Sequence, residues 1–424
     1  MALSRYIERV ESSPTMAVSA KAAAMRREGI DVIALSSGEP DFDTPRNVKD
    51  AAKRAIEEGF TKYTTPASGI VELKEAVCRK FKEDNGLDYG IDQVIVNAGA
   101  KHSLYLAVAA VLNPGDEMII PTPYWVTFTE QPKLIGANPV VVVTKAENGL
   151  KLTAEQFREA ITPKTQMLLL NSPSNPSGAM YSRAELQSLA EIAVEHGIYV
   201  LSDEIYEQLI YDGAEHVSIA SLGDEMKELA IVVNGASKTY AMTGWRIGYT
   251  AAAAAVIAGM DKGQSQTVSH PSSISQKAAL EALTGPQEVV EEMRAAYDVR
   301  RRYMVGRLNN LAGVSCPMPL GAFYAYPDMS CFFGSRSADG SVIVDSSALS
   351  EYLLDEAHVA CVAGLGFGTT KTVDLPMACG CKPSSETTFR PSAYWPVEKY
   401  EIKPPAIIVV GEVVSLREFL KWMD

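Results

Sequence analysis

The chain has 424 residues, 47% of them hydrophobic and 21% charged, a composition that fits a globular protein and excludes a disordered or fibrous one. Its length exceeds the usual size of a single hydrophobic core, so we expect two packed lobes. The net charge of −13 argues against nucleic acid as the main partner, because phosphate backbones are bound by basic surfaces.

The chain start and the cysteines predict a cytoplasmic protein without a membrane partner. Residues 1–10 lack the apolar core of a signal peptide, and the apolar stretch at 251–260 is too short to span a bilayer. The six cysteines form no CxxC pair and no cluster with the spacing of a zinc site. We therefore expect reduced thiols and no metal site.

Apolar segments typical of strands alternate with amphipathic segments typical of helices. Strands are expected at 94–97, 117–120, 167–170, 198–201 and 230–233, and helices at 101–112 and 184–195. This alternation predicts an α/β fold whose mostly parallel sheet is covered by helices on both faces. A long charged helix is expected at 287–310, and the segments after it indicate a smaller α+β lobe.

Polar residues gather directly after the expected strands. They are residues 99–101, Asn175, Asp203, Ser237 and Lys238. In parallel sheets the carboxyl ends of the strands meet at one edge, where ligands bind, so we expect these residues to form a site.

Lys238 is the main candidate for covalent chemistry. A lysine that attacks an aldehyde needs a neutral amine, and a site for an anionic phosphate supplies hydroxyl and guanidinium groups, as Ser237 and Arg246 do nearby in sequence. The ordinary alternative is a surface lysine in a loop. The backbone at 97–101, which opens a helix with free N–H groups, could hold a phosphate.

Four further residues suit a pyridinium cofactor, although three of them also have an ordinary explanation. Asp203 could keep the ring nitrogen protonated, so that the ring takes up electrons, or it could cap a helix. Tyr206 and Asn175 could donate to the phenolate oxygen, whereas Asn175 alone would be a turn residue. Trp125 could stack on the cofactor ring or pack in the core.

These residues, in this order, resemble the class I aminotransferases of the aspartate aminotransferase family, the pyridoxal 5′-phosphate (PLP) fold type I, and among them the bacterial aspartate/prephenate branch. The likeness runs from about residue 3 to about residue 368. The matching segments are 38–45 (GEPDFDTP), 61–64 (TKYT), 124–125 (YW), 171–178 (NSPSNPSG), 202–206 (SDEIY) and 237–248 (SKTYAMTGWRIG).

The resemblance implies a large PLP-binding domain at 46–287, with a seven-stranded, mostly parallel sheet between helices. A small α+β domain would combine 1–45 with 288–424. Lys238 would carry PLP as a Schiff base and shuttle the proton, and Asp203 would pair with the pyridine nitrogen. The remaining cofactor ligands would be Tyr206 and Asn175 at the phenolate oxygen, Trp125 on the ring, and the Ala100 and Lys101 backbone, Ser237 and Arg246 at the phosphate.

The resemblance also implies a homodimer with shared active sites, in which Tyr63 reaches the phosphate of the neighbouring subunit. The reaction would be ping-pong transamination between an amino acid and a 2-oxo acid. The implied substrate contacts are Gly38, through its backbone N–H to the α-carboxylate, Lys101, Trp125, Asn175 and Arg390.

Lys101 bears most directly on the choice of substrate. It stands where this branch has a lysine for the distal carboxylate, and Ser13 and Thr15 match positions that help it. This favours aspartate with 2-oxoglutarate, giving oxaloacetate and glutamate. An aromatic or prephenate aminotransferase stays an alternative, and His102 stands where the family usually has glutamine.

The C-terminal part departs from the family pattern from about residue 369. The family has an arginine for the α-carboxylate in a Phe-Arg-apolar-Ser-Tyr pattern, and the nearest match here is Phe389-Arg390-Pro391. Proline cannot donate to a strand ladder, so this match is imperfect. Arg390 is the expected ligand, and a PLP-binding but inactive homologue stays a further alternative.

Overall fold

The computed structural model describes residues 3–12, 14–337, 340–368 and 407–410. Its centre is a seven-stranded sheet in the order β2-β8-β7-β6-β5-β3-β4. The strands are β2 (Val94–Asn97), β3 (Glu117–Pro121), β4 (Asn138–Val142), β5 (Thr165–Asn171), β6 (Tyr199–Asp203), β7 (Ala230–Gly235) and β8 (Gly248–Ala251). Only β8 runs against its neighbours, so the predicted mostly parallel α/β sheet is confirmed.

Apart from the edge strand β4, the strands are largely buried on both faces, and their side chains alternate between two hydrophobic clusters. In β2, Val94 and Val96 belong to one cluster and Ile95 to the other, as the two-residue period of a strand requires. Helices α2 (Arg46–Glu57), α3 (Val71–Asn85), α7 (Arg183–His196), α8 (Asp224–Leu229) and α11 (Ser273–Thr284) cover the first face. Helices α4 (Ala100–Val111), α5 (Thr127–Leu134) and α10 (Ala254–Thr267) cover the second.

Helix α7 shows how local sequence sets the ends of an element. The Ser182 side chain accepts a hydrogen bond from the backbone N–H of Glu185, and the backbone N–H of Ser182 donates one to the Glu185 carboxylate, which forms a capping box. At the other end Gly197 has a φ of 65°, a left-handed conformation that glycine adopts without strain. The helix predicted at 184–195 is confirmed with one extra residue at each end.

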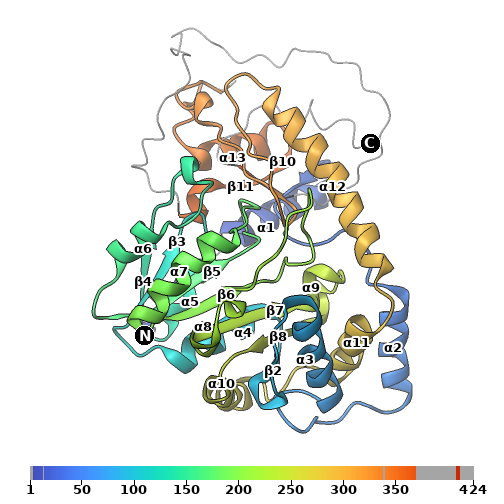
Figure 1. The fold of residues 1–424 in the computed structure, drawn as a ribbon. Coiled ribbons are helices and arrows are strands. Elements are labelled where there is room, and N and C mark those ends of the chain that lie inside the picture. The colour runs from blue at the N-terminus through green and yellow to red at the C-terminus, as the bar shows by residue number, and fades with distance from the viewer. Residues whose placement is uncertain (1–2, 13, 338–339, 369–406, 411–424) are drawn as a thin grey trace.

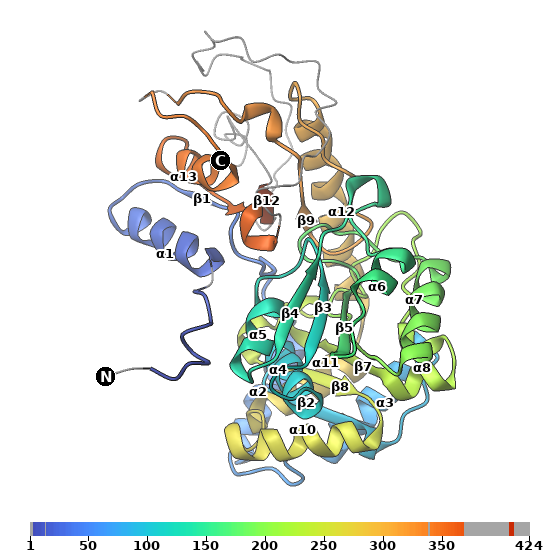
Figure 2. The ribbon, with the colours of Figure 1, turned by 90° about the vertical axis from the view of Figure 1, so that its left-hand side faces the viewer.

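A smaller lobe lies above the large sheet in Figure 1. It contains α13 (Ser346–Asp355) and two small sheets, β1 (Ile33–Ala34) with β10 (Val359–Ala360), and β9 (Tyr324–Ala325) with β12 (Ile407–Val410) and β11 (Val362–Ala363). Helix α1 (Pro14–Arg27) packs on it, as Figure 2 shows. The long α12 (Glu288–Asn309) runs from the side of α11 up to this lobe and confirms the helix predicted at 287–310. The domain boundaries at 45/46 and 287/288 stay a prediction.

Two short elements complete the parts that position the site. Helix α6 (Ala154–Ala160) joins β4 to β5, and α9 (Ala236–Thr239) follows β7 directly and carries the sequence Ala-Ser-Lys-Thr. None of the helices in the described part of the chain is long and apolar enough to cross a membrane.

Candidate active site

Lys238 lies one residue before the end of α9, at the edge of the sheet where β6 and β7 terminate. Its amine Nζ contacts the carbonyl oxygen of Gly38, which lies 200 residues earlier in the chain, and faces the rings of Tyr206 and Phe323 at 5.9 and 5.7 Å. Burial lowers the pKa of Lys238 to about 8, although the carboxylate of Glu39 acts in the opposite direction. A lysine with this pKa has a substantial neutral fraction near pH 7 to 8, which a nucleophilic amine needs.

Asp203 ends β6 with a side chain that is only 4% exposed. One carboxylate oxygen accepts a hydrogen bond of 3.3 Å from the backbone N–H of Ile205. Burial raises the pKa of Asp203 to about 7, while the positive charge of Lys238 lowers it. A buried carboxylate of this kind would be ionised fully by a cation placed next to it.

Tyr206 sits in the turn after β6 and is 3% exposed. Its hydroxyl contacts the hydroxyl of Tyr324 from β9, and the two rings meet edge to face at 5.5 Å. The side chain of Asn175, from the turn after β5, also hydrogen-bonds Tyr206. The structure thus brings the predicted Tyr206 and Asn175 together and adds Tyr324 from the small lobe, which the sequence analysis missed.

The start of α4 and Arg246 form a tight corner. Gly99 precedes the helix with φ 85° and ψ 158°, a backbone conformation essentially restricted to glycine. The guanidinium of Arg246 lies directly against it, because a Cβ built on Gly99 would stand 2.3 Å from Nη2. A Cβ on Gly248 would stand 2.4 Å from the backbone nitrogen of Ala100, so β8 also presses on this corner.

This corner is suited to an anion. The first N–H groups of a helix have no partner within the helix, so Ala100 and Lys101 present theirs outward, and the positive end of the helix dipole adds to the charge of Arg246. Arg246 is held by a hydrogen bond of 2.8 Å to the carbonyl of Thr243. Ser237, 6% exposed, lies in α9 next to Lys238.

Trp125 and Lys101 lie next to each other beside this corner. The amine of Lys101 stands 4.6 Å from the centroid of the Trp125 ring, which meets Phe128 edge to face. His102 lies one residue further, with Nε2 3.4 Å from the hydroxyl of Thr267. Lys101, at the start of α4, therefore holds its amine over the ring of Trp125.

The structure does not place every predicted site residue close to Lys238. Among the described residues, the Tyr63 ring meets His270 edge to face at 5.6 Å, and Tyr63 is 88% exposed. Arg390 and Ser13 lie outside the described residues, and nothing is described of the Thr15 side chain.

Residues 30–386, most of the chain, match the family of class I and II aminotransferases. The chain belongs to this family. An aspartate aminotransferase of Bacillus sp. (strain YM-2) is 47% identical over 376 residues, which cover 89% of this chain and 94% of that protein. An aspartate/prephenate aminotransferase of Cereibacter sphaeroides (strain ATCC 17029 / ATH 2.4.9) is also 47% identical, over 92% of this chain and 98% of that one.

Solved structures agree with this assignment. The aspartate aminotransferase from Rhizobium meliloti superposes with a TM-score of 0.84 at 44% identity, over 87% of this chain and 92% of that one. The Thermus thermophilus aspartate aminotransferase with maleate gives a TM-score of 0.81 at 44% identity, over the same shares of the two chains. The cofactor of this aminotransferase is PLP.

The residues present fit PLP on chemical grounds. Three features match its three polar parts: a buried carboxylate with a raised pKa at Asp203 suits a pyridinium nitrogen, the corner at Arg246 suits a phosphate, and Lys238 suits an aldehyde. A side chain at Gly99 would occupy the space beside the Arg246 guanidinium, so the absence of a Cβ there keeps that corner open.

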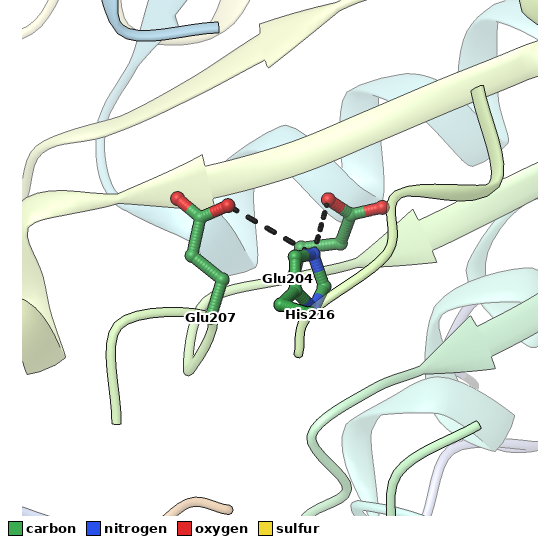
Figure 3. A group of neighbouring side chains, drawn as sticks. All are labelled: Glu204, Glu207 and His216. Carbon is green, nitrogen blue, oxygen red and sulfur yellow. Dashed lines mark hydrogen bonds and ion pairs between the residues drawn. The ribbon is translucent and has the colours of Figure 1, made fainter. Parts of the chain in front are cut away.

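A second group of buried polar residues lies on the other side of the turn after β6 in this aminotransferase. Figure 3 shows Glu204, Glu207 and His216 pointing toward one another. His216 Nε2 lies 3.0 Å from Glu204 and 3.8 Å from Glu207, and the amine of Lys80 contacts Glu207. This group was not predicted from the sequence, although charged residues directly after a buried strand were a signal for it.

Proposed function

We propose that this aminotransferase moves the amino group of aspartate to 2-oxoglutarate, giving oxaloacetate and glutamate in two half-reactions. The observation that carries the proposal is the partly desolvated Lys238 amine, placed between the buried Asp203 and the anion-binding corner at Arg246. The names of the relatives from Bacillus and Rhizobium meliloti support aspartate as the donor.

We assign each contact to PLP by chemistry. Asp203 pairs with the pyridine nitrogen, and Tyr206 and Asn175 hold the phenolate oxygen. The backbone N–H groups of Ala100 and Lys101, with Ser237 and Arg246, bind the phosphate, and Trp125 lies against the ring. When bound, PLP supplies an electron sink that makes the α-hydrogen of the amino acid acidic.

The protein supplies the proton transfers and the orientation. Lys238 Nζ would take the proton from the α-carbon of the substrate, because its pKa of about 8 suits a base at neutral pH. Asp203, once paired with a cation, holds a negative charge in a buried place and keeps the opposing ring nitrogen protonated. The segment of Gly38, which lies against Lys238, offers its backbone N–H to the substrate α-carboxylate.

Lys101 is the proposed ligand of the distal carboxylate of aspartate. Arg390 is the proposed ligand of the α-carboxylate. Replacing Lys101 by Met, which keeps an unbranched side chain but removes the amine that lies over Trp125, should raise KM for aspartate about 10-fold or more and leave KM for phenylalanine within about 3-fold. Equal changes for both donors would contradict the role of Lys101.

The relative from Cereibacter sphaeroides, named an aspartate/prephenate aminotransferase, supports a second oxo-acid substrate for this chain. We therefore propose prephenate as the alternative acceptor. Turnover of glutamate with 2-oxoglutarate replaced by prephenate tests this directly. A protein that binds PLP and turns over neither acceptor would be an inactive homologue.

We propose a homodimer with shared sites in the cytoplasm. The 88% exposure of Tyr63 supports the dimer, because aromatic side chains of this kind are typical of interfaces. Cys78, Cys316 and Cys361 carry free thiols, in keeping with a reducing compartment. Sedimentation of the protein at the mass of one chain would contradict the shared site.

The test of the whole assignment is Lys238→Ala. We expect the variant to lose the visible absorbance of bound PLP and nearly all turnover of aspartate, since the amine is both the attachment point and the base. The control is Lys164→Ala, an exposed lysine before β5, which should behave as wild type. Normal turnover in Lys238→Ala would refute the proposal, and aspartate, glutamate and phenylalanine added singly to wild type would report donor preference by the loss of absorbance.

A further inference from the structure

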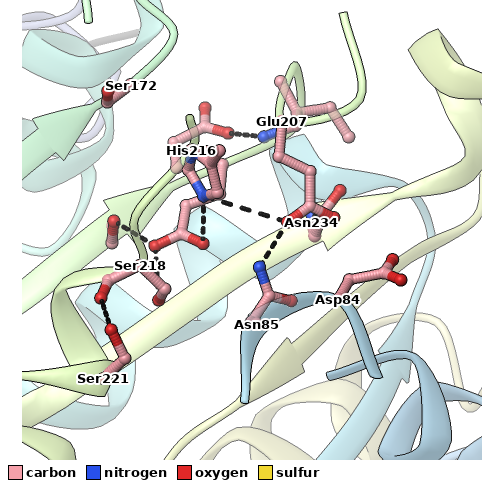
Figure 4. A network of polar contacts seen from close by, with 12 residues as sticks. Asp84, Asn85, Ser172, Glu207, His216, Ser218, Ser221 and Asn234 are labelled. Atoms are coloured by element: carbon pink, nitrogen blue, oxygen red, sulfur yellow. Dashed lines mark hydrogen bonds and ion pairs between the residues drawn. The ribbon is translucent and has the colours of Figure 1, made fainter. Parts of the chain in front are cut away.

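Glu207 is a buried carboxylate next to the site, directly after Tyr206 in the chain, and it is 4% exposed. Figure 4 shows it within a network of polar contacts that joins several elements. One of its oxygens accepts a hydrogen bond of 2.7 Å from the amide of Asn234, and the other accepts one of 2.8 Å from the amide of Asn85. The amine of Lys80 contacts the same carboxylate.

Asn234 belongs to the end of β7 and is 1% exposed. Its amide oxygen accepts a hydrogen bond of 2.7 Å from the backbone N–H of Gly235, and Lys238 follows four residues after Asn234. The bond between Glu207 and Asn234 therefore ties the turn that carries Tyr206 to the end of β7, which leads directly into α9. Asp203, at the end of β6, lies just before the first of these segments, and Lys238 lies just after the second.

The charge of Glu207 is balanced within the network. Burial raises the pKa of Glu207, but the positive charges of Lys80 and His216 outweigh it, and the net pKa lies below the ordinary value. The Lys80 amine also donates to Asn85 at 2.7 Å, which fixes the end of α3 against the same carboxylate. The carboxylate thus stays ionised and holds three elements by charge-assisted hydrogen bonds.

A metal ion would be the other use of this cluster. The ligand atoms of Glu204, Glu207 and His216 lie within 4.8 Å of one another, which suits a cation. The oxygens of Glu207 already accept from Asn234, Asn85 and the Lys80 ammonium, and the oxygens of Glu204 accept from two serines and His216. A cation would compete with an ammonium that is built into the chain, so the contacts favour an ion-pair network.

We infer that Glu207 is a positioning residue for transamination: through Asn234 it sets the separation between the Asp203–Tyr206 turn and Lys238. The inference rests on the proposed function, since it concerns the same site. Loss of the hydrogen bond between Glu207 and Asn234 should let the turn after β6 and the end of β7 move apart by a fraction of an ångström. Such a change costs little stability in a large protein but alters reaction geometry, to which rates are steeply sensitive.

The test uses the PLP-loaded enzyme with the double variant Lys80→Met and Glu207→Leu, which removes the acceptor of the Asn234 hydrogen bond together with the ion pair and leaves no unpaired buried charge. We expect the midpoint of the pH titration of PLP visible absorbance to shift by about half a pH unit or more, because the surroundings of Lys238 and Tyr206 change. The rate of the aspartate half-reaction should fall about 10- to 100-fold, with KM within about 3-fold.

The matched control is Lys151→Met with Glu185→Leu, the same substitutions at a Lys–Glu pair near the start of α7, where the carboxylate also accepts a hydrogen bond. It should keep the wild-type midpoint and rate, although both double variants lose an ion pair. Asn234→Ala cuts the link from the other side and should shift the midpoint as the Glu207 variant does, which keeps the test valid if the double variant does not fold.

A wild-type midpoint in both Asn234→Ala and the Glu207 variant would overturn the inference, and so would an equal shift in the control. Wild type serves as the check on the proposed function. If wild type takes up no PLP, the proposed function fails. If wild type transaminates and the variants show the same midpoint and rate as wild type, the proposed function stands and only the positioning role fails.

Discussion

Substitution of Gly99 by alanine gives the sharpest test of the anion-binding corner. The new Cβ would lie 2.3 Å from Nη2 and 2.7 Å from Cζ of Arg246. Unbonded heavy atoms rest about 3.5 Å apart, so the guanidinium must move by about 1 Å or more. The hydrogen bonds that we propose between Arg246 and the PLP phosphate would not survive such a displacement.

The size of the effect follows from two separate terms. Alanine in the conformation of Gly99 costs about 1 to 3 kcal/mol of stability, whatever lies around it. A hydrogen bond to a charged group contributes about 1.5 to 3 kcal/mol, so losing the contact of Arg246 with the phosphate should weaken PLP binding about 10- to 160-fold. The first term lowers the melting temperature, and the second raises the dissociation constant of PLP.

Gly223→Ala separates these terms, because Gly223 precedes α8 as Gly99 precedes α4. Its φ of 134° and ψ of 160° lie in the same glycine-only region, but a Cβ there would meet nothing within 4 Å. Titration of cofactor-free protein with PLP, followed by visible absorbance, should give wild-type affinity for Gly223→Ala and the predicted loss for Gly99→Ala. Equal PLP affinity in the two variants would refute the role of the corner.

Three further results are expected. Tyr324→Phe removes the hydroxyl in contact with Tyr206 and should weaken PLP binding about 3- to 10-fold in the same titration, whereas unchanged affinity would show that the contact does not matter for the cofactor. Gly306 lies exposed inside α12 with nothing within 4 Å of a built Cβ, so Gly306→Ala should raise the free energy of unfolding by about 0.5 to 1 kcal/mol in urea, and a loss would contradict the helix there. Because burial lowers the pKa of Lys238 to about 8, PLP incorporation measured by stopped-flow absorbance should quicken about 10-fold per pH unit below that value and level off above it; a rate that still rises steeply above pH 9 would contradict this pKa.

The sequence predicted those elements whose burial is marked locally. The strand expected at 94–97 is β2, because a short apolar run between polar segments is typical of a buried strand, and all four residues are buried. The helix at 184–195 was indicated by its helical periodicity and by Gly197, which follows it. Helices α10 and α11 were not predicted, since their small residues give no clear apolar face and only their packing against α4, α2 and α3 selects the helix.

The same limit applies to the site. Asp203, Asn175 and Lys238 were found because each follows a strand, and position in a parallel sheet brings them together. Tyr324 and the link between Glu207 and Asn234 depend on contacts between segments 118 and 27 residues apart, which no local pattern encodes. The structure also shows a contact that was not predicted: the carbonyl of Gly38, a residue expected to contact the substrate, faces the Lys238 amine.

The space around the Lys238 amine is enclosed by residues from distant parts of the chain, from Gly38 near its start to Phe323 and Tyr324 in the small lobe. A ribosome must therefore have released about three quarters of the polypeptide before this enclosure can close. A chain that stopped between residues 251 and 323 would contain every strand of the main sheet but lack the two aromatic residues beside the amine. Contacts between such remote segments form slowly during folding, so we expect this enclosure to close late.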